Sequence, residues 1–185
     1  MATTTRRLIT AEEFLDMDLG EGFHELVRGE VIEVPPPKHP HGRVCMKIGY
    51  RLEFYGRESG YGYVLSNDTA VVTERGPDTV RGADLMFYSK ARLPESRLDD
   101  SALDIVPDLV VEVVSPGNRA SEIRSKIHEY LNAGVFMVWI AYPQRRTLVI
   151  YRRDDPIPIT LTEADTLDNL PELPGFRCPV AEFFV

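Results

Sequence analysis

The pattern of apolar and polar residues divides the chain into short helices and strands. TAEEFLDMD predicts a short helix capped by Thr10, with Glu13 at the spacing of a capping box. FHELVRGEVIEV holds two alternating runs around Arg28-Gly29 and predicts a hairpin. From His41 to about Glu58, apolar residues recur every three or four positions, which predicts a helix that ends near Gly60.

The middle of the chain predicts strands with a helical crossover. YGYVL and TAVVT read as two strands separated by SNDT, and VRGADLMFY as a third. Residues 92–106 give weak signals and predict a loop with some helix. A strand at 109–114, a helix at about 119–133 and the strand VFMVWIAY then follow within ~35 residues, which predicts a right-handed crossover between parallel strands.

RTLVIYRR predicts a returning strand, and the apolar segment LPELPGFRCPVAEFFV is expected to dock on the core. The whole pattern predicts an α/β fold in which a mixed β-sheet is flanked by helices. A length of 185 residues favours a single domain, spanning residues 1–185.

Composition and charge narrow the function classes. The net charge of -8 argues against a broad basic surface for nucleic acid, although a local basic patch stays open. Cys45 and Cys178 belong to no C-x-x-C pair, so we expect core or incidental thiols and no zinc site. The N-terminal segment has no apolar core of a signal peptide, and the longest apolar run, 135–142, is far below the ~18 residues of a membrane span. A cytoplasmic protein is expected.

One acidic residue interrupts a strand that should be buried on both faces. In PDLVVEVVSP, Glu112 shares a face with Val110 and Val114, while Leu109, Val111 and Val113 share the other. An ionised carboxylate there costs several kcal/mol unless it is protonated, paired with a cation or bound to a metal. A structural ion pair, or a strand end that reaches water, is the alternative to a functional role.

Asp84 and Lys126 favour a bound metal over the other ways of compensating the charge of Glu112. Asp84 is a second acid within an apolar strand, and two carboxylates on neighbouring strands would repel each other unless a divalent cation such as Mg²⁺ lay between them. Lys126 lies at the edge of the apolar face of the following helix, from which it could reach Glu112, or it is simply an exposed helical lysine. Two acids, a lysine and a metal suit phosphodiester hydrolysis.

Several segments, taken in order, resemble a known family. They are HELVRGEVIEVPPP, RGADLMFY, PDLVVEVVSP, the K-x-x-x-Y-x-x-x-G-V run from Lys126 to Val135, and LPGF. Together they resemble the PD-(D/E)XK nuclease superfamily and, more closely, its Uma-type family, described as putative restriction endonucleases. The resemblance implies a restriction-endonuclease-like core with one divalent-metal site.

The resemblance also implies roles for particular residues. Asp84 and Glu112 take the two acidic metal-binding positions for Mg²⁺ or Mn²⁺, and the carbonyl of Val113 is the expected further ligand. Lys126 takes the place of the catalytic lysine, and Glu25 matches a hairpin glutamate that reaches the same metal. The chain departs from the superfamily pattern at two positions: Ala83 stands where proline is usual, and Val114 stands where the lysine normally follows the acid.

These arguments lead to three functional hypotheses. The first is a metal-dependent endonuclease that hydrolyses DNA phosphodiester bonds, as a homodimer, because cutting both strands usually needs two sites. The second is a non-catalytic domain of nuclease fold that binds nucleic acid or a protein partner. The third and weakest is a metal-dependent hydrolase of another phosphodiester.

The other residues of interest have structural interpretations, and for some of them a role in the site is the alternative. His39 and His41 flank Pro40 just before the long helix, and His41 could line the site or simply begin the helix. Asp108 is interpreted as a strand-entry residue, and Trp139 as core. The remaining candidates are arginines that could contact phosphate or merely keep the surface solvated, namely Arg119, Arg124, Arg145, Arg146, Arg152 and Arg153.

Overall fold

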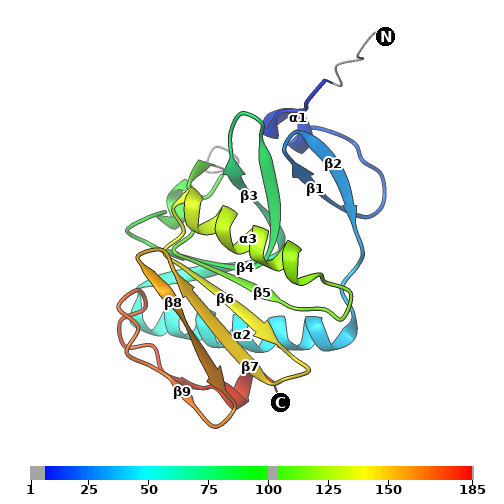
Figure 1. Ribbon diagram of the computed structural model, residues 1–185. Helices are drawn as coiled ribbons and strands as arrows, with labels where there is room; N and C mark the ends of the chain where they lie inside the picture. The colour runs from blue at the N-terminus through cyan, green and yellow to red at the C-terminus, as the bar shows by residue number, and fades with distance from the viewer. Residues whose placement is uncertain (1–6, 100–103, 185) are drawn as a thin grey trace.

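A computed structural model describes residues 7–99 and 104–184 of the chain. Its central feature is an eight-stranded mixed sheet with the order β2-β1-β4-β5-β6-β7-β8, in which β3 also pairs with β4 (Figure 1). The strands of this sheet are β1 (Phe23–Val27), β2 (Glu30–Val34), β3 (Gly62–Glu74), β4 (Thr79–Ser89), β5 (Leu109–Val113), β6 (Met137–Tyr142), β7 (Thr147–Arg152) and β8 (Asp155–Thr162).

Helices and short elements complete the described part of the chain. They are α1 (Ala11–Leu15), α2 (His39–Ser59) and α3 (Ala120–Ala133), the 3₁₀ turns η1 (Glu95–Arg97) and η3 (Val180–Phe183), and the two-stranded pair β9 (Thr166–Leu167) and β10 (Cys178–Pro179). No helix within 7–99 or 104–184 has the length and hydropathy to cross a bilayer.

The predicted crossover is confirmed. β5, α3 and β6 follow one another, and β5 pairs with β6 in parallel, whereas the other described strand pairs are antiparallel. Gly134 ends α3 with a φ of 106°, a left-handed conformation that glycine adopts without steric cost. The direction of these two strands therefore agrees with the expectation from the sequence.

Two helices cover opposite faces of the sheet, as Figure 1 shows for α2 and α3. On one face, Val44, Ile48 and Leu52 of α2 pack with the β5 residues Leu109, Val111 and Val113. On the other face, Ile127 and Tyr130 of α3 pack with Val110. The alternation predicted for β5 is confirmed, and Glu112 lies on the α3 face.

The C-terminal segment docks on the core as expected. Phe176 and Phe183 are buried against the ring of Trp139, at centroid distances of 5.9 and 6.2 Å. Trp139 is fully buried, which confirms its interpretation as core.

The prediction of two strands separated by SNDT is wrong. β3 is one long strand whose pairing with β4 shifts between Ser66 and Thr69. Asn67 and Asp68 take φ values of 69° and 52°, so the extra residue forms a β-bulge rather than ending the strand. The polar residues that resembled a turn therefore lie within the ladder, beside Asp84.

Two strand features were not predicted. β8 forms an edge of the sheet although it contains Pro156 and Pro158, which lack the N–H that a central strand needs. β9 and β10 are too short to leave an alternating pattern. Part of the 92–106 segment forms η1, and its residues 100–103 lie outside the described ranges.

Candidate functional site

A polar cleft of about 1200 Å³ lies between the first hairpin, the β3 bulge, the N-terminus of α2 and the start of α3. The residues lining it include Glu25, Asp84, Glu112, Val113 and Lys126, which are all the residues to which the sequence assigned a catalytic or metal-binding role. Residues distant from one another in the sequence thus contribute to one concave surface.

Asp84 lies where β4 and β5 separate. The ladder between these strands pairs Leu85 with Val111 and goes no further in this direction, so Asp84 and Glu112 fall just beyond its end. The Asp84 carboxylate fills the gap and accepts a hydrogen bond of 2.6 Å from the backbone N–H of Val113. Separation of the two strands leaves room for polar side chains in an otherwise apolar sheet.

The alternation of side chains along β4 also changes at this position. Arg81 and Ala83 face α3, through an ion pair of Arg81 with Glu129 and packing of Ala83 in the α3-side core. Leu85 and Phe87 pack with α2 on the opposite face. Asp84 therefore stands at an irregularity in the strand, which lets its carboxylate turn toward α2.

Glu112 contacts two polar residues of α3. The hydroxyl of Tyr130 donates to its carboxylate at 2.7 Å, and the ammonium of Lys126 lies 3.4 Å from both carboxylate oxygens. The Glu112 side chain is 15% exposed, at the floor of the cleft. Lys126 and Tyr130 are one turn apart on α3, so the helix places both over the same acid.

Lys126 binds Glu25 more closely than Glu112. Its ammonium lies 2.8 Å from the Glu25 carboxylate, which also accepts from Arg81 at 2.7 Å. Burial opposes the charge on Lys126, but the carboxylates of Glu112 and Glu25 outweigh it and raise the pKa of Lys126. At neutral pH this lysine is a cation, suited to offsetting negative charge and unsuited to accepting a proton.

The surroundings of Glu112 favour its protonated form, in contrast to the charged form of Lys126. Burial raises the pKa of Glu112 to about 7, and the negative charge of Asp84 adds to this, while Lys126 lowers it. Lys126 is shared with Glu25, so its charge compensates only part of the cost of burying Glu112. The pKa of Glu25 is instead lowered, because its two cations overcome the effect of burial.

Arg81 and Glu129 extend this network and were missed by the sequence analysis. Arg81 is buried and forms a bidentate pair with Glu129 at 2.6 and 2.8 Å, besides its bond to Glu25. The three carboxylates of Glu25, Glu112 and Glu129 thus share two permanent cations, Arg81 and Lys126. Nothing in the sequence shows that β4 and α3 bring Arg81 and Glu129 together.

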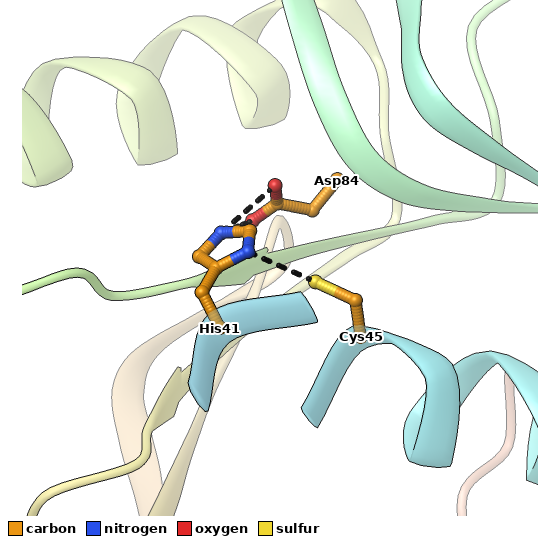
Figure 2. A group of neighbouring side chains, drawn as sticks. All are labelled: His41, Cys45 and Asp84. Atoms are coloured by element: carbon orange, nitrogen blue, oxygen red, sulfur yellow. Dashed lines mark hydrogen bonds and ion pairs between the residues drawn. The ribbon is translucent and has the colours of Figure 1, made fainter. Parts of the chain in front are cut away.

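His41 begins the other side of the cleft. Its Nε2 lies 3.1 Å from the Asp84 carboxylate, and its Nδ1 lies 3.4 Å from the Sγ of Cys45, one turn later on α2. Figure 2 shows the imidazole ring between the acid and the thiol. Burial opposes protonation of His41, but the hydrogen bond and charge of Asp84 raise its pKa. Cys45 was expected to be a core or incidental thiol, and it packs against the α2-side core while also lying beside His41 and Asp84.

Asp68 is a further carboxylate near Asp84. The β3 bulge places it in the lining of the cleft. Burial and the neighbouring charge of Asp84 raise the pKa of Asp68. Asp68 was not among the predicted site residues, because SNDT was interpreted as a break between two strands.

Asp108 and the C-terminal arginines have structural contacts. Asp108 is buried, binds Arg92 at 2.9 Å and accepts from the Ser89 N–H, in agreement with a strand-entry role. Arg146 pairs with Glu163, Arg152 with Glu172 and Arg153 with Asp154, and Arg145 lies over the ring of Tyr142.

The remaining candidates lie nearer the helices. Arg119 lines the cleft, with a side chain 82% exposed, whereas Arg124 lines a smaller depression on α3. His39 is exposed at the first position of α2. Of these three, Arg119 is placed to meet a ligand in the cleft.

Comparisons with known proteins identify relatives of this chain. The sequence model of the Uma2 family, described as "Putative restriction endonuclease", matches residues 11–181. The crystal structure of a protein from Anabaena variabilis, described as "a putative nuclease belonging to DUF820", is similar with a TM-score of 0.78. The match covers 95% of this chain and 97% of that one at 20% identity, so it shows a shared fold. No curated protein matches the chain in sequence.

Proposed function

Because the chain belongs to the Uma2 family of putative restriction endonucleases, we propose that its cleft hydrolyses phosphodiester bonds of DNA with the help of Mg²⁺ or Mn²⁺. The observation that carries this proposal is the placement of Lys126 beside Glu112 in the cleft that Asp84 also lines. The lysine lies on a helix and not at the usual strand position, yet its ammonium contacts the expected acid.

The donors in the cleft fit a hard divalent cation. Three carboxylates share the two permanent cations Arg81 and Lys126, and the contacts of Asp84 among the described residues are to His41 and the N–H of Val113. Carboxylate oxygens are the ligands that Mg²⁺ prefers. Asp84 and Glu112 would hold the ion, with the Val113 carbonyl as the further ligand that the family resemblance implies.

The ion would polarise the scissile phosphate and lower the pKa of an attacking water. Lys126 supplies a fixed positive charge beside the phosphate, where it stabilises the charge that develops in the transition state. Glu25 is better placed to position Lys126 than to bind the metal, because its described contacts are to Lys126, Arg81 and the N–H of Gly82. Tyr130 orients Glu112 through its hydroxyl.

Metal binding is tested by thermal unfolding of the full chain with and without Mn²⁺. At a concentration 100 times the Kd, binding adds about 2.7 kcal/mol, or about 5–10 °C in Tm for a chain of this size. Glu112→Gln should abolish the shift, while Glu95→Gln, whose side chain is 61% exposed and outside the cleft lining, should keep it.

Catalysis is tested separately on supercoiled plasmid DNA. The wild type should nick it with Mg²⁺ or Mn²⁺ and not with a chelator, and Glu112→Gln should be inactive. Lys126→Met should keep the Mn²⁺-induced Tm shift and lose cleavage. Intact plasmid under varied metal and salt, together with a normal Tm shift, would favour the alternative of a non-catalytic nuclease-fold domain that binds nucleic acid or a protein partner.

A further inference from the structure

We propose that His41, Cys45 and Asp84 form a second metal site, which takes a transition-metal dication of the Zn²⁺ class in competition with Mg²⁺. The two sites share Asp84 and differ in every other donor. The binding of the transition metal stands on the side chains of this cluster alone, and only the competition with Mg²⁺ rests on the proposed function.

The geometry suits a small tetrahedral ion. One ligand atom from each of the three side chains can be chosen so that all lie within 4.8 Å of one another. Zn–S of about 2.3 Å and Zn–N of about 2.0 Å put these two ligands about 3.5 Å apart in a tetrahedral site. Cys45 Sγ and His41 Nδ1 are 3.4 Å apart, so the separation of these two ligand atoms already matches a tetrahedral site (Figure 2).

The fold holds the donors in place before any ion binds. His41 and Cys45 are one turn apart on α2, so they point to the same side of the helix. Asp84 is fixed opposite them by the N–H of Val113. Rotation of the Asp84 side chain would bring a carboxylate oxygen into the coordination sphere, with a fourth position left to solvent.

The donor types decide which ion the cluster prefers. A thiolate and an imidazole are ligands for Zn²⁺, Co²⁺ or Ni²⁺, whereas Mg²⁺ is bound by oxygen atoms. The thiol of Cys45 keeps its proton in the absence of metal, because burial and the charge of Asp84 raise its pKa. On binding, the thiol proton leaves to solvent and the sulfur lone pair binds the ion, so that no oxidant or reductant is required.

Sharing of Asp84 makes the two ions exclude each other. The Asp84 carboxylate already lies beside His41, and a transition-metal ion held there by His41 and Cys45 would engage the same carboxylate that the Mg²⁺ ion needs in the cleft. A transition-metal ion at this site therefore removes one of the two acids from the proposed Mg²⁺ site. Zn²⁺ would act as an inhibitor of the proposed nuclease.

Cobalt provides a readout that does not depend on activity. The chelator-treated full chain is titrated with Co²⁺, and a thiolate-to-cobalt charge-transfer band in the near ultraviolet reports a metal bound to sulfur. We expect one equivalent of Co²⁺ to produce the band and Zn²⁺ to remove it. Cys45→Ser should abolish the band, and Cys178→Ser should keep it, because Cys178 lies in the apolar core away from the cleft.

Two further variants separate this site from the proposed Mg²⁺ site. Asp84→Asn should weaken Co²⁺ binding at least tenfold, while Glu112→Gln should leave it within about twofold. Circular dichroism shows whether each variant is folded. A wild type without the band, a band retained in Cys45→Ser, or a band lost equally in Glu112→Gln would each overturn the proposal. Failure of plasmid cleavage leaves the spectral result unchanged.

Discussion

At the scale of single residues, the site is defined by how charge is distributed. Lys126 is held as a cation by Glu25 and Glu112, whereas burial favours the protonated form of Glu112. A lysine that stays charged can stabilise a phosphate but cannot accept a proton from water. This argues against Lys126 as a general base, and it favours the metal as the source of nucleophile activation in the proposed reaction.

A second carboxylate gives a prediction on pH, away from the cleft. Although burial opposes it, hydrogen bonds from the N–H groups of Ala11 and Gly76, and the charge of Arg75, lower the pKa of Asp78. A lowered folded-state pKa stabilises the fold above the unfolded-state pKa of about 3.9, and this contribution is lost as pH falls through the folded value.

We therefore expect Asp78→Asn to lower the free energy of unfolding at pH 7 by roughly 1–2 kcal/mol, because hydrogen bonds to a charged acceptor are replaced by weaker ones. The difference from wild type should shrink at pH 3, where more of Asp78 is protonated. Urea unfolding at both pH values measures this, and an equal difference at the two would show that the charge of Asp78 contributes nothing.

At the scale of elements, close packing of α2 on the sheet limits what the helix can carry. Gly56 of α2 lies so near β3 that an added Cβ would be 2.4 Å from the carbonyl oxygen of Gly62. Gly42, on the same helix, has no atom within 4 Å of such a Cβ. Substitution of these two glycines by alanine therefore distinguishes the effect of helix propensity, at Gly42, from the effect of close packing, at Gly56.

In an open helix, alanine is more favourable than glycine by about 1 kcal/mol. We expect Gly42→Ala to raise the free energy of unfolding by up to that amount. Gly56→Ala should lower it by about 1–3 kcal/mol, because backbone must move to relieve the clash. Denaturant unfolding of both variants tests the pair, and a Gly56→Ala protein as stable as Gly42→Ala would contradict the packing described.

The sequence predicted some elements and not others for physical reasons. β5 was predicted because it is a short run of β-branched and other apolar residues, and α3 because its few apolar residues recur at helical spacing. β8 was missed because Pro156 and Pro158 suppress the strand signal, although an edge strand tolerates them. The bulge at Asn67–Asp68 was mistaken for a break between two strands, since Asn and Asp tolerate the left-handed backbone conformation that occurs in bulges and in connections alike.

The residues of the site, like the elements of the fold, were predicted only in part. The position of Lys126 at the edge of the apolar face of α3 left two alternatives, an approach to Glu112 or an exposed lysine, and the structure has the approach. Resemblance to a family supplied the role of Asp84, which its apolar neighbours alone could only suggest. The contact of Cys45 with His41 follows from their spacing on α2, but the approach of Asp84 to His41 depends on the irregularity in β4, which no local pattern shows.

At the scale of the whole molecule, a net charge of -8 restricts how DNA could be held. The basic residues that line the cleft, apart from the interior Arg81 and Lys126 and the histidines, are Arg28, Lys38 and Arg119. About three phosphate contacts would give a slope of about -3 for the logarithm of affinity against the logarithm of salt. The homodimer stays a prediction, and each protomer would contribute one such cleft.

We expect DNA affinity to fall about 40-fold between 50 and 200 mM salt, far less than for an extensive basic interface. Fluorescence anisotropy with Glu112→Gln, which should bind without cutting, measures the slope. Arg119→Gln should reduce the slope by about 1, while Arg124→Gln, outside the cleft lining, should leave it unchanged. A slope steeper than about -6 would place the DNA on a surface other than the cleft.

The prolines of β8 bear on how neighbouring molecules meet in a concentrated solution. An unprotected rim of backbone donors and acceptors invites strands of other chains to extend the ladder, which is a common start of fibre growth. Pro156 and Pro158 bring no N–H group to this edge strand and lie where its pairing with β7 is irregular, while Ile157 stays 73% exposed between them. The prolines that obscured this strand in the sequence therefore also disfavour its pairing with strands of other molecules. Threonine at these two positions would restore the backbone N–H groups and make such pairing more favourable.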